Sequence, residues 1–353
     1  MSPALSAAPA LTARQAASRI VARQVRELFR WEKPARRGED VEAVHQMRVQ
    51  TRRLRAALAL FASVVRPLRR AGRTRLRWLS RALGRVRDLD VIIALLEDGH
   101  LAHLEDVEAA RLEDLLAALK ERRWRAQQKL AASLARGRYE KLKAALRDFA
   151  RHPRFVGRGA EEAMAARWLT DVIHRLARRV SAHRAMADRA PEAADLHELR
   201  IAFKRLRYVL DFHAETCGIA FDEERRLTRL LQDCLGEIHD HDVLIGWFSE
   251  AAGTGAPGHG RTGKRRRGLA AKTPVEAELF AGAWRVLPER LAANRARLLR
   301  RFLRLRREWL ARTEPAGPVV ALEAPRFVNL EAAPVQLRLA APQRTVASLR
   351  IVR

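Results

Sequence analysis

The sequence predicts an all-α fold built from a duplicated helical unit, and three observations lead to that prediction. Apolar residues recur three and four positions apart within segments of roughly 15 to 35 residues, which is the periodicity of amphipathic helices. Only 6% of the 353 residues are aromatic, and the Val/Ile/Thr alternation typical of strands is missing up to about residue 312. In addition, two sequence blocks recur at one constant offset.

The expected helices end where Gly and Pro cluster. These breakers follow one another along the chain at Pro34 and Gly38, Pro67 and Gly72, Gly99, Gly137, residues 153–159, Pro191 and Gly218. Short connections between helices of this size indicate antiparallel bundles. Two stretches depart from the pattern: a basic Gly-rich loop is expected at 251–273, and the tail at 313–353 is expected to be disordered or a short extended segment.

The repeat has an offset of 152 residues. Residues 44–61 read VHQMRVQTRRLRAALALF, and residues 196–213 read LHELRIAFKRLRYVLDFH. The blocks LSRALGRVRDLDV (79–91) and LQDCLGEIHDHDV (231–243) keep the same offset. We therefore predict a first helical repeat at 11–152 and a second at 160–312.

On a helical wheel, the repeated helix carries two stripes. The expected core seam consists of Met47, Leu54, Leu58, Phe61 and Val65. On roughly the opposite side lies a basic row with spacings of three, four and three. The first ladder is His45, Arg48, Arg52 and Arg55, and the second ladder is His197, Arg200, Lys204 and Arg207.

The ladders predict a bound polyanion. Like charges three and four residues apart repel by a few tenths of a kcal/mol per pair, and the first ladder has no carboxylate on its own face. Guanidinium groups suit phosphate because their planar fork grips two oxygens and stays protonated. His45 and His197 could donate a hydrogen bond to an anion or orient the ladders. A solvated helix face is the alternative interpretation, which the matched placement in both halves disfavours.

Composition agrees with a polyanionic partner, since 69 Lys+Arg against 41 Asp+Glu give a net charge of +28. Cys217 and Cys234 are too few for a disulfide framework and lack zinc-site spacing. No segment approaches the ~18 to 20 apolar residues of a membrane span, and the N-terminus lacks the features of a signal peptide. We expect a soluble, reduced, cytoplasmic protein with no membrane partner.

The repeated segments 79–91 and 231–243, here called the acidic blocks, allow two interpretations. Their carboxylates could pair with buried arginines and orient the ladders, or bind a divalent metal; we expect the structural role for Asp88, Asp90, Asp240 and Asp242. Residues 239–242 read His-Asp-His-Asp, like a metal-dependent phosphohydrolase, but the first half has Arg-Asp-Leu-Asp there. The loop at 258–265 nearly matches a P-loop, but has Arg265 where Ser or Thr is needed. We therefore expect no enzyme, metal or cofactor.

The paired blocks resemble the CHAD family, the conserved-histidine α-helical domain, over roughly residues 11–312. The resemblance implies two four-helix bundles with pseudo-twofold symmetry around a basic central groove or pore. It also implies non-enzymatic binding of inorganic polyphosphate, often at polyphosphate granules. The triphosphate tunnel domain that many members carry has an E-x-E-x-K signature, which this chain lacks.

Carried over by position, the resemblance adds Arg53 and Arg205 to the ladder residues as polyphosphate contacts. Arginines in register outside these helices are weaker candidates: Arg23, Arg26, Arg73, Arg77, Arg175, Arg178, Arg225 and Arg229. A nucleic-acid-binding protein is the second hypothesis, because the net charge alone would favour it. The ladders, however, lack the interleaved aromatics that stack on bases. A metal-dependent phosphohydrolase ranks third.

Overall fold

The all-α prediction is confirmed by the computed structural model. It describes residues 11–97, 106–156, 164–182, 191–218, 221–251, 274–281, 284 and 286–313. Within these ranges the chain forms helices and two isolated β-bridges but no strand. Most of the predicted loop (252–273) and tail (314–353) lies outside the described residues.

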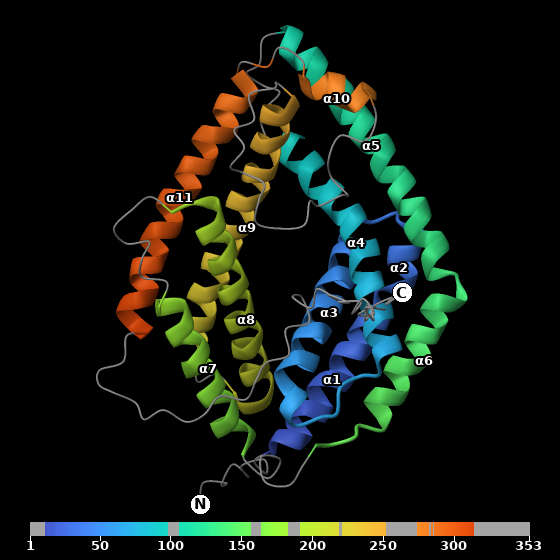
Figure 1. The fold of residues 1–353 in the computed structure, drawn as a ribbon, viewed down its shortest axis with the longest axis vertical. Helices are drawn as coiled ribbons and strands as arrows, with labels where there is room; N and C mark the ends of the chain where they lie inside the picture. Colours follow the sequence, from blue (N-terminus) through green and yellow to red (C-terminus); the bar gives the residue numbers. More distant parts are fainter. Residues whose placement is uncertain are drawn as a thin grey trace, which may run out of the picture.

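The helices fall into two halves that lie side by side (Figure 1). The first half contains α1 (Ala13–Arg30), α2 (Glu32–Arg37), α3 (Val41–Leu60), the 3-10 turn η1 (Phe61–Ser63), α4 (Arg70–Glu97), α5 (Asp106–Leu134) and α6 (Gly137–Arg151). The second half contains α7 (Ala165–Ala182), α8 (Ala193–Cys217), α9 (Asp222–Ala251), α10 (Pro274–Ala281) and α11 (Val286–Thr313).

Helix boundaries follow local sequence signals. Thr12 caps α1, since its side chain accepts from the Gln15 amide while the Gln15 side chain accepts from the Thr12 amide. Asp40 caps α3 by accepting from the Glu42 amide at 2.8 Å. Gly38 ends α2 with a φ of 75°, a left-handed conformation that favours glycine. These caps fix where α3, the helix of the first ladder, begins.

The duplication is visible in the helix boundaries. Helices α1 and α7, α3 and α8, and α4 and α9 each begin 152 residues apart. The fourth helices keep a different offset of 172 residues, because buried Leu115 and Leu119 of α5 correspond to buried Leu287 and Leu291 of α11. The 20 additional residues fall between α9 and α11. The offset of 152 residues found in the sequence therefore holds for three helices of each half and does not extend to the fourth.

Two apolar clusters join the halves. The larger one runs through α1, α3, α4, α7, α8 and α9 and includes Met47, Leu54, Phe61 and Val65 of the predicted seam. Leu58 is only partly buried against it. The smaller cluster unites the ends of α4, α5, α9, α10 and α11. Because apolar packing connects the halves in both clusters, the helices that carry the ladders are held in fixed relation to each other.

Candidate functional site

The first ladder lies along the neighbouring helix α4. All four of its side chains are half-buried. The Arg48 guanidinium pairs with Asp88 of α4 at 3.2 Å, and Arg55 donates to the Ser80 hydroxyl at 3.2 Å. The side chains of the first ladder thus pack along α4 and do not project from an open helix face. Contacts with α4 align the guanidinium groups of the ladder.

Gly84 gives Arg48 its place on α4. A Cβ at Gly84 would overlap the Arg48 guanidinium, whereas a Cβ at the equivalent Gly236 would have nothing within 4 Å. Glycine at this position thus allows the close approach of Arg48 to the α4 backbone. The glycine lets Arg48 cross the helix surface to reach Asp88 one turn further along.

The paired glycines provide a matched experiment. Glycine to alanine inside a helix stabilises by up to about 1 kcal/mol, so we expect Gly236→Ala to raise the free energy of unfolding by about that amount. Gly84→Ala should raise the free energy of unfolding by less, because the new methyl group displaces Arg48 from Asp88. Urea unfolding of both variants measures the difference. Equal gains would show that Gly84 does not position Arg48.

The second ladder occupies the equivalent place, with α8 beside α9. The Arg207 guanidinium lies 3.8 Å from the Asp233 carboxylate of α9. The His197 ring lies 6.0 Å from the His239 ring, also of α9. His197, Arg200, Lys204 and Arg207 are all half-buried, as in the first ladder. Both ladders therefore meet the helix that follows them in the chain.

Arg53, assigned to the ligand by the resemblance, is engaged with protein carboxylates. Its guanidinium pairs with Asp211 at 3.3 Å and with Glu215, both on α8, and its Nε donates to Gln24 of α1. The side chain is 19% exposed. Arg53 thus ties the halves together. Its counterpart Arg205 is exposed.

The pairing of Arg53 was hidden from sequence reasoning because it is asymmetric. The positions of the first half that correspond to Asp211 and Glu215 are Ala59 and Ser63. Burial raises the pKa of Glu215, while the charges of Arg53 and Arg23 oppose that rise. Burial and the two arginines therefore act on this carboxyl group in opposite directions.

The weaker candidate arginines occupy several environments. Three of the eight lie near carboxylates: Arg23 near Glu215 at 3.6 Å, Arg229 near Asp211 at 3.8 Å and Arg225 near Asp222 at 2.6 Å. Arg26 is exposed and Arg175 is half-buried. Arg73 and Arg77 join Arg55 of the first ladder around a small pocket of about 90 Å³. This pocket brings three predicted ligand residues together.

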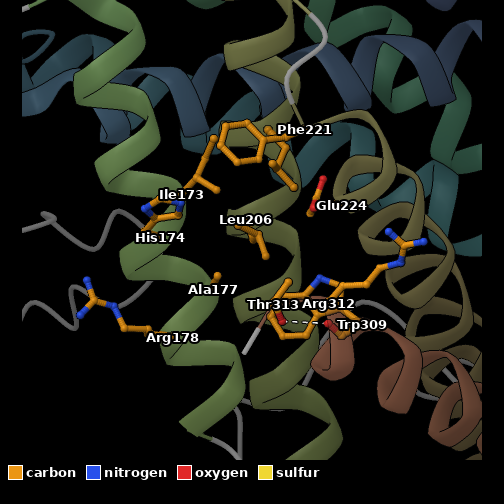
Figure 2. A pocket seen from close by; sticks show the side chains of 11 residues that line it. Ile173, His174, Ala177, Arg178, Leu206, Phe221, Glu224, Trp309, Arg312 and Thr313 are labelled. Atoms are coloured by element: carbon orange, nitrogen blue, oxygen red, sulfur yellow. Dashed lines mark hydrogen bonds between the residues drawn. The ribbon is translucent and has the colours of Figure 1, made fainter. Parts of the chain in front are cut away.

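Arg178 lies at the rim of a different pocket. This pocket of about 260 Å³ is formed by α7, α8, α9 and α11, and Figure 2 shows Leu206, Phe221 and Trp309 among its lining. The lining is mainly apolar, with Arg312 as a second basic residue. Leu206 belongs to the buried side of α8, so this pocket is distinct from the second ladder.

The acidic blocks connect each half to its fourth helix. Asp90 of α4 pairs with Arg123 of α5 at 2.8 Å, and Asp242 of α9 pairs with Arg295 of α11. Burial raises the pKa of Asp90, and its hydrogen bond to Arg123 opposes the rise. Asp88 contacts the first ladder directly, whereas Asp240 is half-buried. Within the described residues, no group of three His, Cys, Asp or Glu side chains is arranged to hold a metal ion.

His45 is held in its neutral form by its surroundings. Burial lowers the pKa of its imidazole, and the charges of Arg87, Arg52 and Arg48 lower it further, although Glu42 opposes them. Arg87 lies outside the predicted set, and the signal that would have found it is its position next to Asp88 in the repeated block. The first ladder therefore carries a concentrated positive potential.

Comparisons place this geometry among known proteins. The family model described as CHAD domain matches residues 19–249. The crystal structure of the CHAD domain from the plant Ricinus communis superposes with a TM-score of 0.63 at 24% identity, covering 87% of this chain and 95% of that one. PptA from Streptomyces chartreusis gives a TM-score of 0.57 at 16% identity, covering 85% and 100%.

At these identities the two solved structures establish the fold alone. No curated protein matched the chain. Among the described helices, none is long and apolar enough to span a bilayer. The family match extends over both ladders and both acidic blocks and covers more than half of the sequence. The chain therefore belongs to the CHAD domain family.

Proposed function

We propose that this protein binds inorganic polyphosphate without hydrolysing it. The observation that carries the proposal is the pair of ladders. They have the same spacing on equivalent helices, and each lies along the next helix of its half, α4 for the first ladder and α9 for the second. A linear polymer with one charge per repeating unit suits such rows, because it needs no recognition beyond charge and phosphate geometry. Membership of the CHAD family supports the same partner.

We also propose that the halves are two four-helix bundles related by a pseudo-twofold axis, with the ladders lining one basic groove or pore. Helices that the repeat makes equivalent pack against each other across the junction: α1 with α7, α3 with α8 and α4 with α9. Thr12 and Met164, which are equivalent residues, form an antiparallel bridge. Contacts between equivalent elements are those expected around a twofold axis.

Nucleic acid is the less favoured partner. Binding of single strands relies on exposed aromatic side chains on which bases stack. Among the described residues, the exposed large apolar side chains include one aromatic, Trp124, which lies on α5 and not on a ladder helix. A phosphate chain without bases uses the ladders fully, whereas a nucleic acid would leave its bases without partners there.

Calorimetric titration with long-chain polyphosphate tests the proposal. We expect tight binding that weakens steeply as salt rises from about 50 to 500 mM, because neutralising each phosphate releases a counterion. Orthophosphate release, followed in the same samples with Mg²⁺ or Mn²⁺, should stay at the background rate. Absence of binding at low salt would overturn the proposal. Release abolished by Asp88→Ala or Asp240→Ala would show a phosphohydrolase instead. Localisation at polyphosphate granules in the cytoplasm is a further expectation, testable by fluorescence microscopy.

His45 should make binding dependent on pH. In the free protein its pKa is lowered by burial and by Arg87; bound phosphates would favour the imidazolium and raise it again. A group whose pKa is higher in the complex takes up a proton on binding, so affinity should increase as the pH falls from about 7.5 to 5.5, by about tenfold for each unit of the rise. Titrations of wild type and His45→Gln at both pH values measure this. Identical pH slopes would show that His45 does not contact the ligand.

A further inference from the structure

A second basic surface lies outside the ladders, on α11. Four arginines of this helix line a pocket of about 650 Å³ that also contacts α9 and the end of α4. We name them the α11 row: Arg297, Arg300, Arg301 and Arg304. All four are exposed. Their spacing of three and four residues places them on neighbouring positions of one helix face, as in the ladders.

The charge of the α11 row is poorly compensated. Among the described residues, no carboxylate lies within ion-pair distance of any of the four guanidinium groups, and Arg297 bonds to Asn294. Glu237 is the single acid in the pocket lining, where His241 is the remaining titratable group. His241 is buried and its Nδ1 lies 2.9 Å from the Glu237 carbonyl oxygen. Four like charges around one pocket repel unless an anion neutralises them.

Half of the α11 row departs from the duplicated pattern, since Arg297 and Arg301 correspond to Arg125 and Lys129 of α5 whereas the other two arginines have no cationic counterpart. Arg123 of α5 and Arg295 of α11 pair with Asp90 and Asp242, which are equivalent residues of the repeat. Aligning these two arginines aligns α5 with α11 residue by residue. In that register, Arg300 corresponds to Gln128 and Arg304 to Ala132. The second half therefore carries two cationic side chains that the first half lacks.

The α11 row lies beside the second ladder, with α9 between them, because α9 meets the ladder at His239 and Asp233 and lines the pocket of the row with Glu237 and His241. Asp233 of α9 lies 3.8 Å from Arg207, the last ladder residue. The charges of Arg207, Arg229 and Arg301 all act on the Asp233 carboxyl group. One acidic residue thus separates the ladder from the α11 row, and positive charge continues on its far side.

We propose that the α11 row extends the second ladder sideways across α9 and gives the protein a preference for long linear polyphosphate over short chains. This inference rests on the proposed function. A chain that occupies the second ladder reaches the additional cations only if it is long enough to cross α9 as well. The row spans about 10 Å of helix, at 1.5 Å per residue. Short oligophosphates bind within the ladders and gain nothing from it.

The test replaces the two unduplicated arginines by their first-half counterparts, in the variant Arg300→Gln/Arg304→Ala. Removing two phosphate contacts should weaken binding of long-chain polyphosphate about tenfold or more, while tripolyphosphate affinity stays within about twofold of wild type. The matched control is Arg125→Gln/Lys129→Gln, which removes two exposed charges from α5 at the positions that correspond to Arg297 and Arg301. The control should bind both ligands like wild type. Thermal unfolding of each variant verifies folding.

Each outcome decides between hypotheses. Failure of the wild-type protein to bind either phosphate would overturn the proposed function itself. Wild-type binding with an unchanged variant, or with equal losses for long-chain polyphosphate and tripolyphosphate, would overturn the extension while leaving the ladders in place. A larger loss for single-stranded RNA than for polyphosphate, measured at equal phosphate concentration, would also overturn it and assign the α11 row to nucleic acid.

Discussion

Reversing one charge in each ladder, with Arg52→Glu and Lys204→Glu together, is expected to weaken polyphosphate binding at least about 100-fold. A hydrogen bond to a charged group contributes about 1.5 kcal/mol or more, so two lost contacts amount to at least about 3 kcal/mol. Arg52 is half-buried among His45 and the other ladder residues, and among the described residues it forms no ion pair. Its replacement therefore acts on the ligand and not on an internal salt bridge.

The matched control reverses two charges that lie far from both ladders in the chain. Lys129→Glu and Lys141→Glu change the net charge by the same amount on exposed positions of α5 and α6. We expect this control to lower the affinity only slightly, through the reduced overall potential. Calorimetric titration at one salt concentration compares the three proteins. If the control loses as much affinity as the ladder variant, binding depends on net charge and the ladders are not the site.

Arg123→Ala is expected to lower the free energy of unfolding by about 3 to 5 kcal/mol. The Asp90 side chain is only 2% exposed, and Arg123 is its ion-pair partner at 2.8 Å. Removing one member of a buried pair leaves the other charge without compensation. In Arg295→Ala the corresponding loss should be smaller, since the Asp242 and Arg295 side chains are 23% and 25% exposed.

The pH dependence of the Arg123→Ala variant identifies the cause. Without Arg123, the pKa of Asp90 should rise further above its unfolded value, because burial already raises it. A raised pKa in the folded state means that the folded protein binds the proton more tightly, so the deficit in stability should shrink as the pH falls. Asp90→Asn in the same background should recover part of the loss at neutral pH. A deficit that persists unchanged in both tests would point to lost packing of the Arg123 side chain.

The fold could be predicted because the duplication presents the same helix periodicity and the same sequence blocks in both halves of the chain. The 152-residue offset located three helices of each half, and the apolar seam was found on the buried side for Met47, Leu54, Phe61 and Val65. Leu58 is the exception, since it lines the pocket beside Arg55. The fourth helices escaped the offset because 20 additional residues precede α11. Their arginines, Arg123 and Arg295, were missed for the same reason.

The local environment of the site depends on contacts between helices, and the repeated sequence pattern does not show which helices are in contact. The wheel placed the ladders opposite the seam but did not show that they lie along α4 and α9, where Asp88, Ser80 and Asp233 meet them. The carboxylates that meet Arg53 come from the other half and have no equivalents in its own half. Sequence periodicity reports which face of a helix is polar, but not which neighbour that face meets.

Equilibrium competition tests the central claim most directly. Labelled long-chain polyphosphate bound to the 353-residue protein is displaced by unlabelled polyphosphate, single-stranded RNA or duplex DNA, with concentrations counted as phosphate and at near-physiological salt. Two half-buried cationic ladders without stacking aromatics predict that polyphosphate displaces the label at a concentration at least about tenfold lower than either nucleic acid. Displacement by RNA or DNA at an equal or lower concentration would contradict the account.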